Sequence, residues 1–313
     1  MLADSTWSRY GRKVYLLKRI RAIVIVIAVI SVVIVGVLAA SRFQNDVVSE
    51  KRELLRVWNE GGYEQAREIS KNALLNDPVD YFMLTINGFS AYQLGISQIN
   101  NQNTIHFIDE CIFSLRKALI QNNSASVDGR VCYVLGKAYG YKGVEYSDLA
   151  VKYLEMADNV SYDASDIPEY LGLAYAAYGD YRSSVEAFSR AFVPGSHPSD
   201  NLLLSIARSY MAMEDYDMAI SYLRRCIDVS FDSRTVVLSR LMLAEIYVAV
   251  NDYDNAEAQY LSIISDTGDS ANVNFLLGEL YSLRGDATRA RSQWRLAYRQ
   301  DPAHAGARAR LNI

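Results

Sequence analysis

The chain has 313 residues, of which 50% are apolar and 22% are charged, and it contains only 5 prolines and 3 cysteines. This composition excludes a disordered chain, a collagen-like repeat and a disulfide scaffold, and the length suggests one or two domains. The formal net charge is -4, but residues 1–40 carry six basic side chains against Asp4 alone, so the remainder of the chain is more acidic than the total suggests. An acidic body of this kind is not expected to bind nucleic acid through bulk electrostatics.

The first predicted element is a transmembrane helix at residues 22–40. This segment contains nineteen residues without a charge. As a helix it would span about 28 Å, close to the ~30 Å hydrocarbon core of a bilayer. Six basic residues lie in the 15 positions before the span and three in the 15 positions after it. Residues 1–21 are therefore expected to form a basic cytoplasmic tail, and residues 41–47 a linker on the outer side of the membrane.

A cleaved signal peptide is the alternative interpretation of this segment. Val37, Ala39 and Ala40 could form its cleavage site. However, the apolar run is longer than the core of about 7–15 residues that is typical of signal peptides. We therefore expect a retained anchor at the inner membrane, with the N-terminus in the cytoplasm and the body in the periplasm.

From residue 48 onward the sequence repeats itself. Five segments place a small residue three positions before a tyrosine, and these tyrosines are spaced by 36, 35, 37 and 34 residues. The five tyrosines are Tyr139, Tyr175, Tyr210, Tyr247 and Tyr281. A period near 34 residues predicts helix–turn–helix units, in which glycine or alanine lets two helices approach closely. Each unit leaves an apolar face that only its neighbour can cover, so we expect the units to stack.

This pattern resembles the tetratricopeptide repeat (TPR) family. The unit that ends at Pro302 shows the motif nearly complete, with Leu277, Gly278, Tyr281, the turn Gly285-Asp286, Ala290, Trp294 and Ala297. The resemblance implies an all-α fold, a TPR-type α-solenoid in which helix–turn–helix repeats form a right-handed superhelix. Together with the predicted anchor, the expected architecture is this solenoid preceded by one N-terminal transmembrane helix.

We count about seven repeats over residues 48–302, and the pattern weakens toward the N-terminus. The first helix of the first unit, Val48–Glu60, lacks the small residue and the tyrosine. In the second unit the polar stretch Ser97–His106 is about eleven residues too long for the pattern, which predicts an inserted loop. Residues 303–313 begin an eighth first helix and are expected to form a C-terminal capping segment.

Candidate catalytic and metal-binding residues are few. The histidines lie far apart without a second ligand at zinc spacing, and the cysteines form no C-x-x-C pair, so we expect buried structural thiols. Ser114 and Lys117 match the S-x-x-K motif, but they lie on a repeat's second helix and lack its companion motifs. We therefore expect no catalytic residue, no metal, no cofactor and no enzymatic activity. The residues considered are His106, His197, His304, Cys111, Cys132 and Cys226.

The family resemblance implies a concave groove along the first helices of the repeats. Basic residues dominate its third unit and acidic residues its sixth and seventh, with apolar side chains between them. Such a gradient suits an extended or helical peptide bound in one direction, although an ordinary solvated helix face is the alternative. The predicted protein-binding residues are Arg130, Tyr133, Lys137, Glu169, Leu173, Leu204, Arg208, Leu241, Glu245, Phe275 and Glu279.

The sequence thus favours a non-enzymatic, membrane-anchored scaffold that binds protein partners and assembles a complex on the periplasmic side of the inner membrane. Its layout is similar to that of subunits of periplasmic machines, such as translocon-associated, chaperone-like repeat proteins and the collar of spirochaete periplasmic flagella. One alternative is an import or sorting receptor whose repeats face the cytosol. Another is a cryptic enzyme or an enzyme-regulatory subunit.

Overall fold

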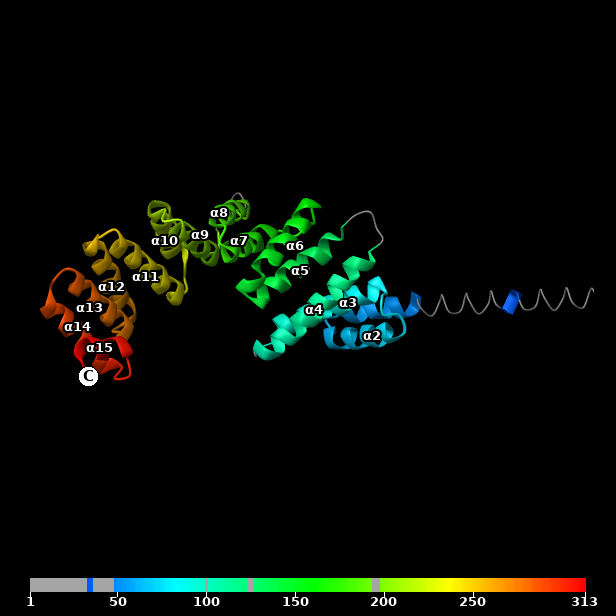
Figure 1. Cartoon of the computed structure of the whole chain (residues 1–313), viewed down its shortest axis with the longest axis horizontal. Helices are drawn as coiled ribbons and strands as arrows, with labels where there is room; N and C mark the ends of the chain where they lie inside the picture. Colours follow the sequence, from blue (N-terminus) through cyan, green and yellow to red (C-terminus); the bar gives the residue numbers. More distant parts are fainter. Residues whose placement is uncertain (1–32, 36–47, 99–100, 123–126, 193–197) are drawn as a thin grey trace, which may run out of the picture.

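The computed structural model describes residues 33–35, 48–98, 101–122, 127–192 and 198–313. The described residues form helices and turns without any strand. The helices follow one another along an elongated, curved body, with α2 near one end and α15 with the C-terminus at the other (Figure 1). The all-α repeat architecture expected from the sequence is therefore confirmed.

Residues 48–59 form the first helix of this body. The elements that follow are α2 (Tyr63–Asn76), α3 (Tyr81–Ile96), α4 (Asn101–Gln121), α5 (Gly129–Lys142), the 3-10 helix η1 (Val144–Tyr146), α6 (Ser147–Asn159), α7 (Ile167–Tyr178), α8 (Tyr181–Arg190), α9 (Asp200–Ala212), α10 (Tyr216–Val229), α11 (Ser233–Ala249), α12 (Tyr253–Thr267), α13 (Ala271–Leu283), α14 (Ala287–Gln300) and α15 (Ala305–Leu311).

The helices pair within units and the units stack in chain order. The first helix of each unit packs against the second, as α5 does against α6 and α13 against α14. Each second helix then contacts the first helix of the next unit, from α4 against α5 to α14 against α15. The core is therefore continuous along the array, and its extent follows from the number of units.

Small residues in the first helices let bulky side chains of the second helices approach the backbone. The glycine pairs are Gly136 with Leu154, Gly172 with Phe188 and Gly278 with Trp294. A β-carbon on Gly136 would lie 2.5 Å from Leu154 Cγ, and one on Gly278 would lie 2.5 Å from Trp294 Cδ1. Any larger residue at these positions would force the two helices apart, because protein interiors are closely packed.

The turn between the two helices of a unit is built around an aspartate. In α8, α10, α12 and α14 this aspartate is the N-cap, and its side chain accepts a hydrogen bond from the backbone N–H three residues later. The residue before it has a positive φ, which ends the preceding helix. The cap satisfies a backbone donor that the helix leaves unpaired, as the repeated Asp-Tyr turns predict. The four aspartates are Asp180, Asp215, Asp252 and Asp286.

Neighbouring units are also joined by polar contacts at the start of the first helices. The N-cap residue of a first helix is held by a side chain from the previous first helix in four places. The contacts are Lys51 with Asp80 (2.9 Å), Tyr81 with Asp128 (2.5 Å), Tyr133 with Asp166 (2.7 Å) and Asn272 with His304 (3.0 Å). These contacts link the first helices of successive units.

The prediction of an inserted loop at Ser97–His106 is wrong for most of this segment. The helix α4 already begins at Asn101, so residues 101–106 extend the second helix of the unit. Just beyond this extension α4 packs against α3, where a β-carbon on Gly95 would come within 3.2 Å of Ile108 Cδ1. The extra residues thus lengthen a helix pair instead of forming a surface loop.

The predicted membrane span at residues 22–40 lies outside the described residues, apart from the short helical piece 33–35. In the part of the chain that the structure describes, no helix has both the length and the hydropathy needed to cross a membrane.

Replacing Gly172 with alanine is expected to destabilise the array. The added β-carbon would overlap the ring of Phe188, so the α7–α8 pair must separate at a cost of about 1–3 kcal/mol. Gly140 in α5 is the matched control, because a β-carbon there meets nothing within 4 Å. Gly140→Ala should stabilise by ~0.5 kcal/mol through helix propensity. Urea unfolding midpoints measure both variants, and equal shifts in the two would contradict the packing role of Gly172.

Candidate protein-binding site

A hollow lies between α5, α7 and the start of α6, where two consecutive first helices meet. We call it the α5–α7 hollow. Its volume is about 260 Å³ and its lining is largely apolar. The lining includes Gly140, Tyr141, Val144, Tyr170, Ala174 and Ala177. A water molecule needs only about 10–15 Å³ on the same measure, so there is ample room for an apolar side chain. Two of the predicted binding residues, Lys137 and Leu173, are among those that line it.

Gly140 has no packing reason to be a glycine. It lies within α5, its φ is not positive, and a β-carbon there would meet no other atom within 4 Å. Glycine in a helix costs roughly 0.5–1 kcal/mol relative to alanine. Since no neighbour excludes a side chain, the effect of Gly140 is to keep the α5–α7 hollow open.

Lys137 brings a positive charge to the wall of the hollow. Its Nζ lies 4.0 Å from the ring centroid of Tyr170 and 4.7 Å from that of Tyr133. It donates a hydrogen bond to the Tyr133 hydroxyl (2.8 Å) and forms an ion pair with Asp166 (3.2 Å). Burial alone would lower the pKa of Lys137, but these polar partners raise it above its ordinary value. The ammonium therefore stays charged at neutral pH.

Tyr133 and Asp166 fix the two first helices relative to each other. The Tyr133 hydroxyl lies 2.7 Å from both carboxylate oxygens of Asp166, which is the N-cap residue of α7. Burial raises the pKa of Tyr133 to about 12, so the hydroxyl keeps its proton and donates it to the carboxylate. The hollow is thus preformed, which lowers the entropic cost of filling it.

Apolar side chains at the mouth of the hollow are open to solvent. Leu173 is 43% exposed, Tyr141 is 45% exposed and Val144 is 60% exposed. Exposed apolar side chains grouped around a hollow are typical of interaction surfaces.

The predicted residues of the third and fourth units lie on α5 and α7. Arg130 is exposed, with its guanidinium carbon 5.1 Å from the ring centroid of Phe89, and Glu169 is half-buried. Of the five predicted residues on these two helices, Lys137 and Leu173 line the hollow, and Tyr133 holds Lys137. The structure thus brings three of them together.

Leu204 differs from the expectation of an exposed groove residue. It is only 5% exposed and belongs to the core cluster formed with α10 and α11. The same register position in other units, Leu241 and Phe275, is half-buried. This position faces the neighbouring helices, so an apolar side chain there packs inward. Four residues after Leu204 and Leu241, on the same helices, lie Arg208 in α9 and Glu245 in α11. Both are exposed, as expected for groove residues.

The predicted groove residues of the last unit are covered by α15. A β-carbon on Gly306 in α15 would lie 2.6 Å from the ring of Phe275. The Phe275 ring also contacts the ring of His304, and the two ring centroids are 4.9 Å apart. Glu279 forms an ion pair with Arg310 (2.5 Å). The chain's own last helix thus occupies this end of the groove. The predicted charge gradient is reduced, because Lys137 and Glu279 both have partners within the molecule.

Tyr141, Val144 and Tyr170 were not predicted as binding residues. The signal that could have found them is Gly140 beside Tyr141, a helical glycine outside the repeat pattern. It lies four residues after Gly136, which the pattern does explain.

Of the other candidate residues, His106, Ser114 and Lys117 border a cleft between α2 and α4. Ser114 is buried and accepts a hydrogen bond from Asn87 (2.9 Å), and the three cysteines are buried without a disulfide. The described residues contain no group of three histidine, cysteine or acidic side chains that could hold a metal ion. His197 lies outside the described residues.

Comparisons with known proteins agree with this architecture. Residues 180–313 match the family described as tetratricopeptide repeat-like domain. The fold is similar to the C-terminal part of a TPR repeat-containing protein from Cytophaga hutchinsonii, with a TM-score of 0.61 and 14% identity, over 82% of this chain and 97% of that chain. It is also similar to PilW, a type IV pilus biogenesis factor, with a TM-score of 0.53 and 16% identity, over 72% of this chain and 98% of PilW. These likenesses show the fold.

A curated relative gives a shorter match. The type II methyltransferase M.CeqI from Rhodococcus hoagii is 30% identical over 96 residues, which are 28% of this chain and 19% of the methyltransferase. The chain therefore spans about a fifth of the length of this relative. Residues 180–313 thus match the tetratricopeptide repeat-like family, and the preceding units show the same helix pairing.

Proposed function

We propose that this protein is a non-enzymatic TPR scaffold that holds a protein partner at the α5–α7 hollow. The observation that carries the proposal is a preformed apolar hollow between two first helices, kept open by a glycine that packing does not require. The partner segment that fits presents a bulky apolar side chain to the hollow, in an extended or helical conformation. Exposed Leu173, Tyr141 and Val144 surround that side chain, while Lys137 and Tyr133 give the wall a polar edge.

We also propose that residues 22–40 anchor the array in the inner membrane, with the repeats on the periplasmic side. Support comes from nineteen consecutive residues without a charge and from the six basic residues that precede them. An array held there by one end can recruit partners and bring them together in a complex, because tethering raises their effective concentration.

Gly140→Leu is expected to weaken capture of the partner strongly. The leucine side chain would fill the α5–α7 hollow, and the loss of one buried apolar anchor costs about 2 kcal/mol, so binding should fall more than about tenfold. The measurement is photo-crosslinking in cells, with p-benzoylphenylalanine in place of Val144, which is exposed at the hollow.

The matched control places the same photoreactive residue at Leu261, which is exposed on the distant helix α12. We expect a discrete adduct from position 144, its loss in the Gly140→Leu background, and no equivalent adduct from position 261. An adduct that is equally strong with and without Gly140→Leu would count against the hollow as the binding site.

A reporter fused to the C-terminus tests the proposed orientation. We expect a reporter that is active only after export to be active, because the basic residues before the span favour a cytoplasmic N-terminus. A cytosolic reporter should then be inactive in the same fusion. The opposite pattern would support a receptor whose array faces the cytosol.

A further inference from the structure

The second helices of the first two units carry apolar side chains that the described chain leaves exposed. Leu75 on α2 is 81% exposed, and Phe113 and Ile120 on α4 are 68% and 76% exposed. Leu75 and Phe113 border a cleft of about 680 Å³ between α2 and α4, together with Leu74 and Pro78. Exposed apolar groups of this kind indicate an interaction surface.

A lysine lies within this apolar surface. Phe113, Lys117 and Ile120 are spaced by four and three residues, so they share one face of α4. The Lys117 Nζ lies 6.0 Å from the ring centroid of Phe113. We define the α2–α4 face as Leu75, Phe113, Lys117 and Ile120.

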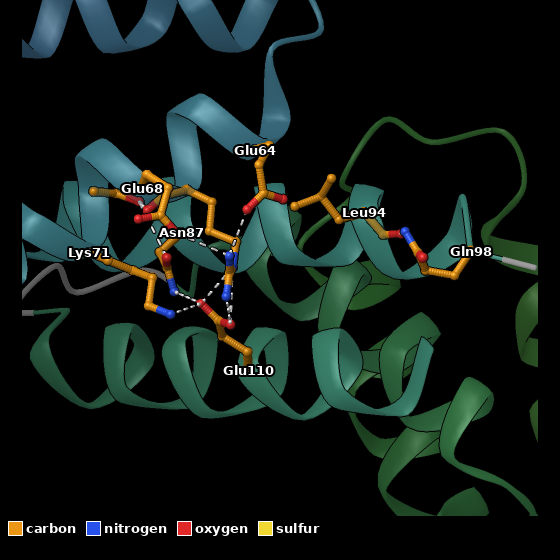
Figure 2. A network of polar contacts seen from close by, with 9 residues as sticks. Glu64, Glu68, Lys71, Asn87, Leu94, Gln98 and Glu110 are labelled. Atoms are coloured by element: carbon orange, nitrogen blue, oxygen red, sulfur yellow. Dashed lines mark hydrogen bonds and ion pairs between the residues drawn. The ribbon is translucent and has the colours of Figure 1, made fainter. Parts of the chain in front are cut away.

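The acidic side chains near this face are paired with basic side chains, although those of Glu64 and Glu68 remain exposed. Arg67 pairs with Glu110 (2.8 Å) and also with Glu64 (3.0 Å) and Glu68 (3.3 Å). Figure 2 shows Glu64, Glu68, Lys71, Asn87 and Glu110 converging on this centre between α2 and α4. Burial alone would raise the pKa of Glu110, but its contacts with Arg67 and Lys71 hold the pKa below the ordinary value.

Among the described charged side chains that border the cleft, Lys117 is the one without an ion partner. Asp109, which also borders the cleft, forms an ion pair with Lys142 (2.6 Å). Within the part of the chain that the structure describes, Lys117 makes no ion pair. The cleft therefore presents an ammonium group without an ion partner beside exposed apolar side chains. This arrangement complements a surface with an anionic outer layer over an apolar layer. Lipid head groups over acyl chains have this order.

We propose that the α2–α4 face rests on the surface of a phospholipid bilayer. Leu75, Phe113 and Ile120 enter the interfacial region, and Lys117 reaches the phosphates, as lysine does when its stem follows apolar surface. The proposal rests on the proposed anchor at residues 22–40. The linker 41–47 can extend at most about 25 Å, so the first two units must stay beside the membrane.

Depth-dependent quenching tests this proposal with the full chain in vesicles. Cysteine is introduced at Leu75 or Ile120 and labelled with the fluorophore NBD, and the native cysteines are buried and so shielded from the label. The vesicles contain phosphatidylcholine and phosphatidylglycerol with or without brominated acyl chains, which quench only a label that enters the bilayer. The control label is at Leu261, which is exposed in a distant unit.

We expect brominated lipid to reduce the fluorescence at positions 75 and 120 and leave position 261 unchanged. Phe113→Ser with Lys117→Gln should weaken the quenching at both positions without changing the unfolding midpoint, since both side chains are on the surface. If the chain floats with the vesicles but shows no quenching at positions 75 and 120, this proposal is overturned and the anchor is retained. A protein partner would then be the occupant of the α2–α4 face. A chain that does not float overturns the anchor and this proposal with it.

Discussion

The architecture depends on the close approach of two helices at a small residue. Where a first helix carries the repeat glycine, a bulky side chain of the second helix occupies the space, as Phe188 does at Gly172 and Trp294 at Gly278. Alanine has the same role in the fifth and sixth units, where Ala207 and Ala244 are fully buried. This contact fixes the distance between the helices of a unit. Stacking of equal units then sets the curvature of the array and the surface that its first helices share.

Gly140 has a different role from the packing glycines. One of these, Gly136, lies four residues before it in the same helix, and the others lie in other units. At Gly136 a β-carbon would collide with Leu154, whereas at Gly140 it would meet nothing. The first glycine builds the fold, and the second leaves room beside it. The α5–α7 hollow follows from this difference, and the contact of Tyr133 and Lys137 with Asp166 holds its walls in place.

Much of the fold could be predicted from the sequence because its signals are local and repeated. The small residue before each repeat tyrosine and the aspartate of each turn lie within one unit, so their spacing alone indicates helix pairs and caps. Side-chain burial was harder to predict, because it depends on neighbouring units. Leu204 occupies a groove register, yet adjacent helices bury it. Phe275 and Glu279 are covered by a helix that begins about thirty residues later.

The polar centre of the first two units shows the same limit more strongly. Arg67 and Glu110 are separated by 43 residues in the chain, and neither belongs to the repeat pattern. Their pairing joins α2 and α4, the second helices of successive units, so no spacing within one unit indicates it. Similarly, the α5–α7 hollow is formed by residues of four elements, and of its lining residues only Lys137 and Leu173 lay in the predicted groove.

Occupancy of the α5–α7 hollow by a protein partner is tested most directly by hydroxyl-radical footprinting of the complex purified from native membranes. Oxidation of Tyr141 and Leu173 is compared before and after release of the partner, with exposed Leu261 as the internal reference. We predict that Tyr141 and Leu173 are protected in the complex and become reactive on release, while Leu261 does not change. Unchanged reactivity of Tyr141 and Leu173, with protection confined to other units, would contradict binding at the hollow.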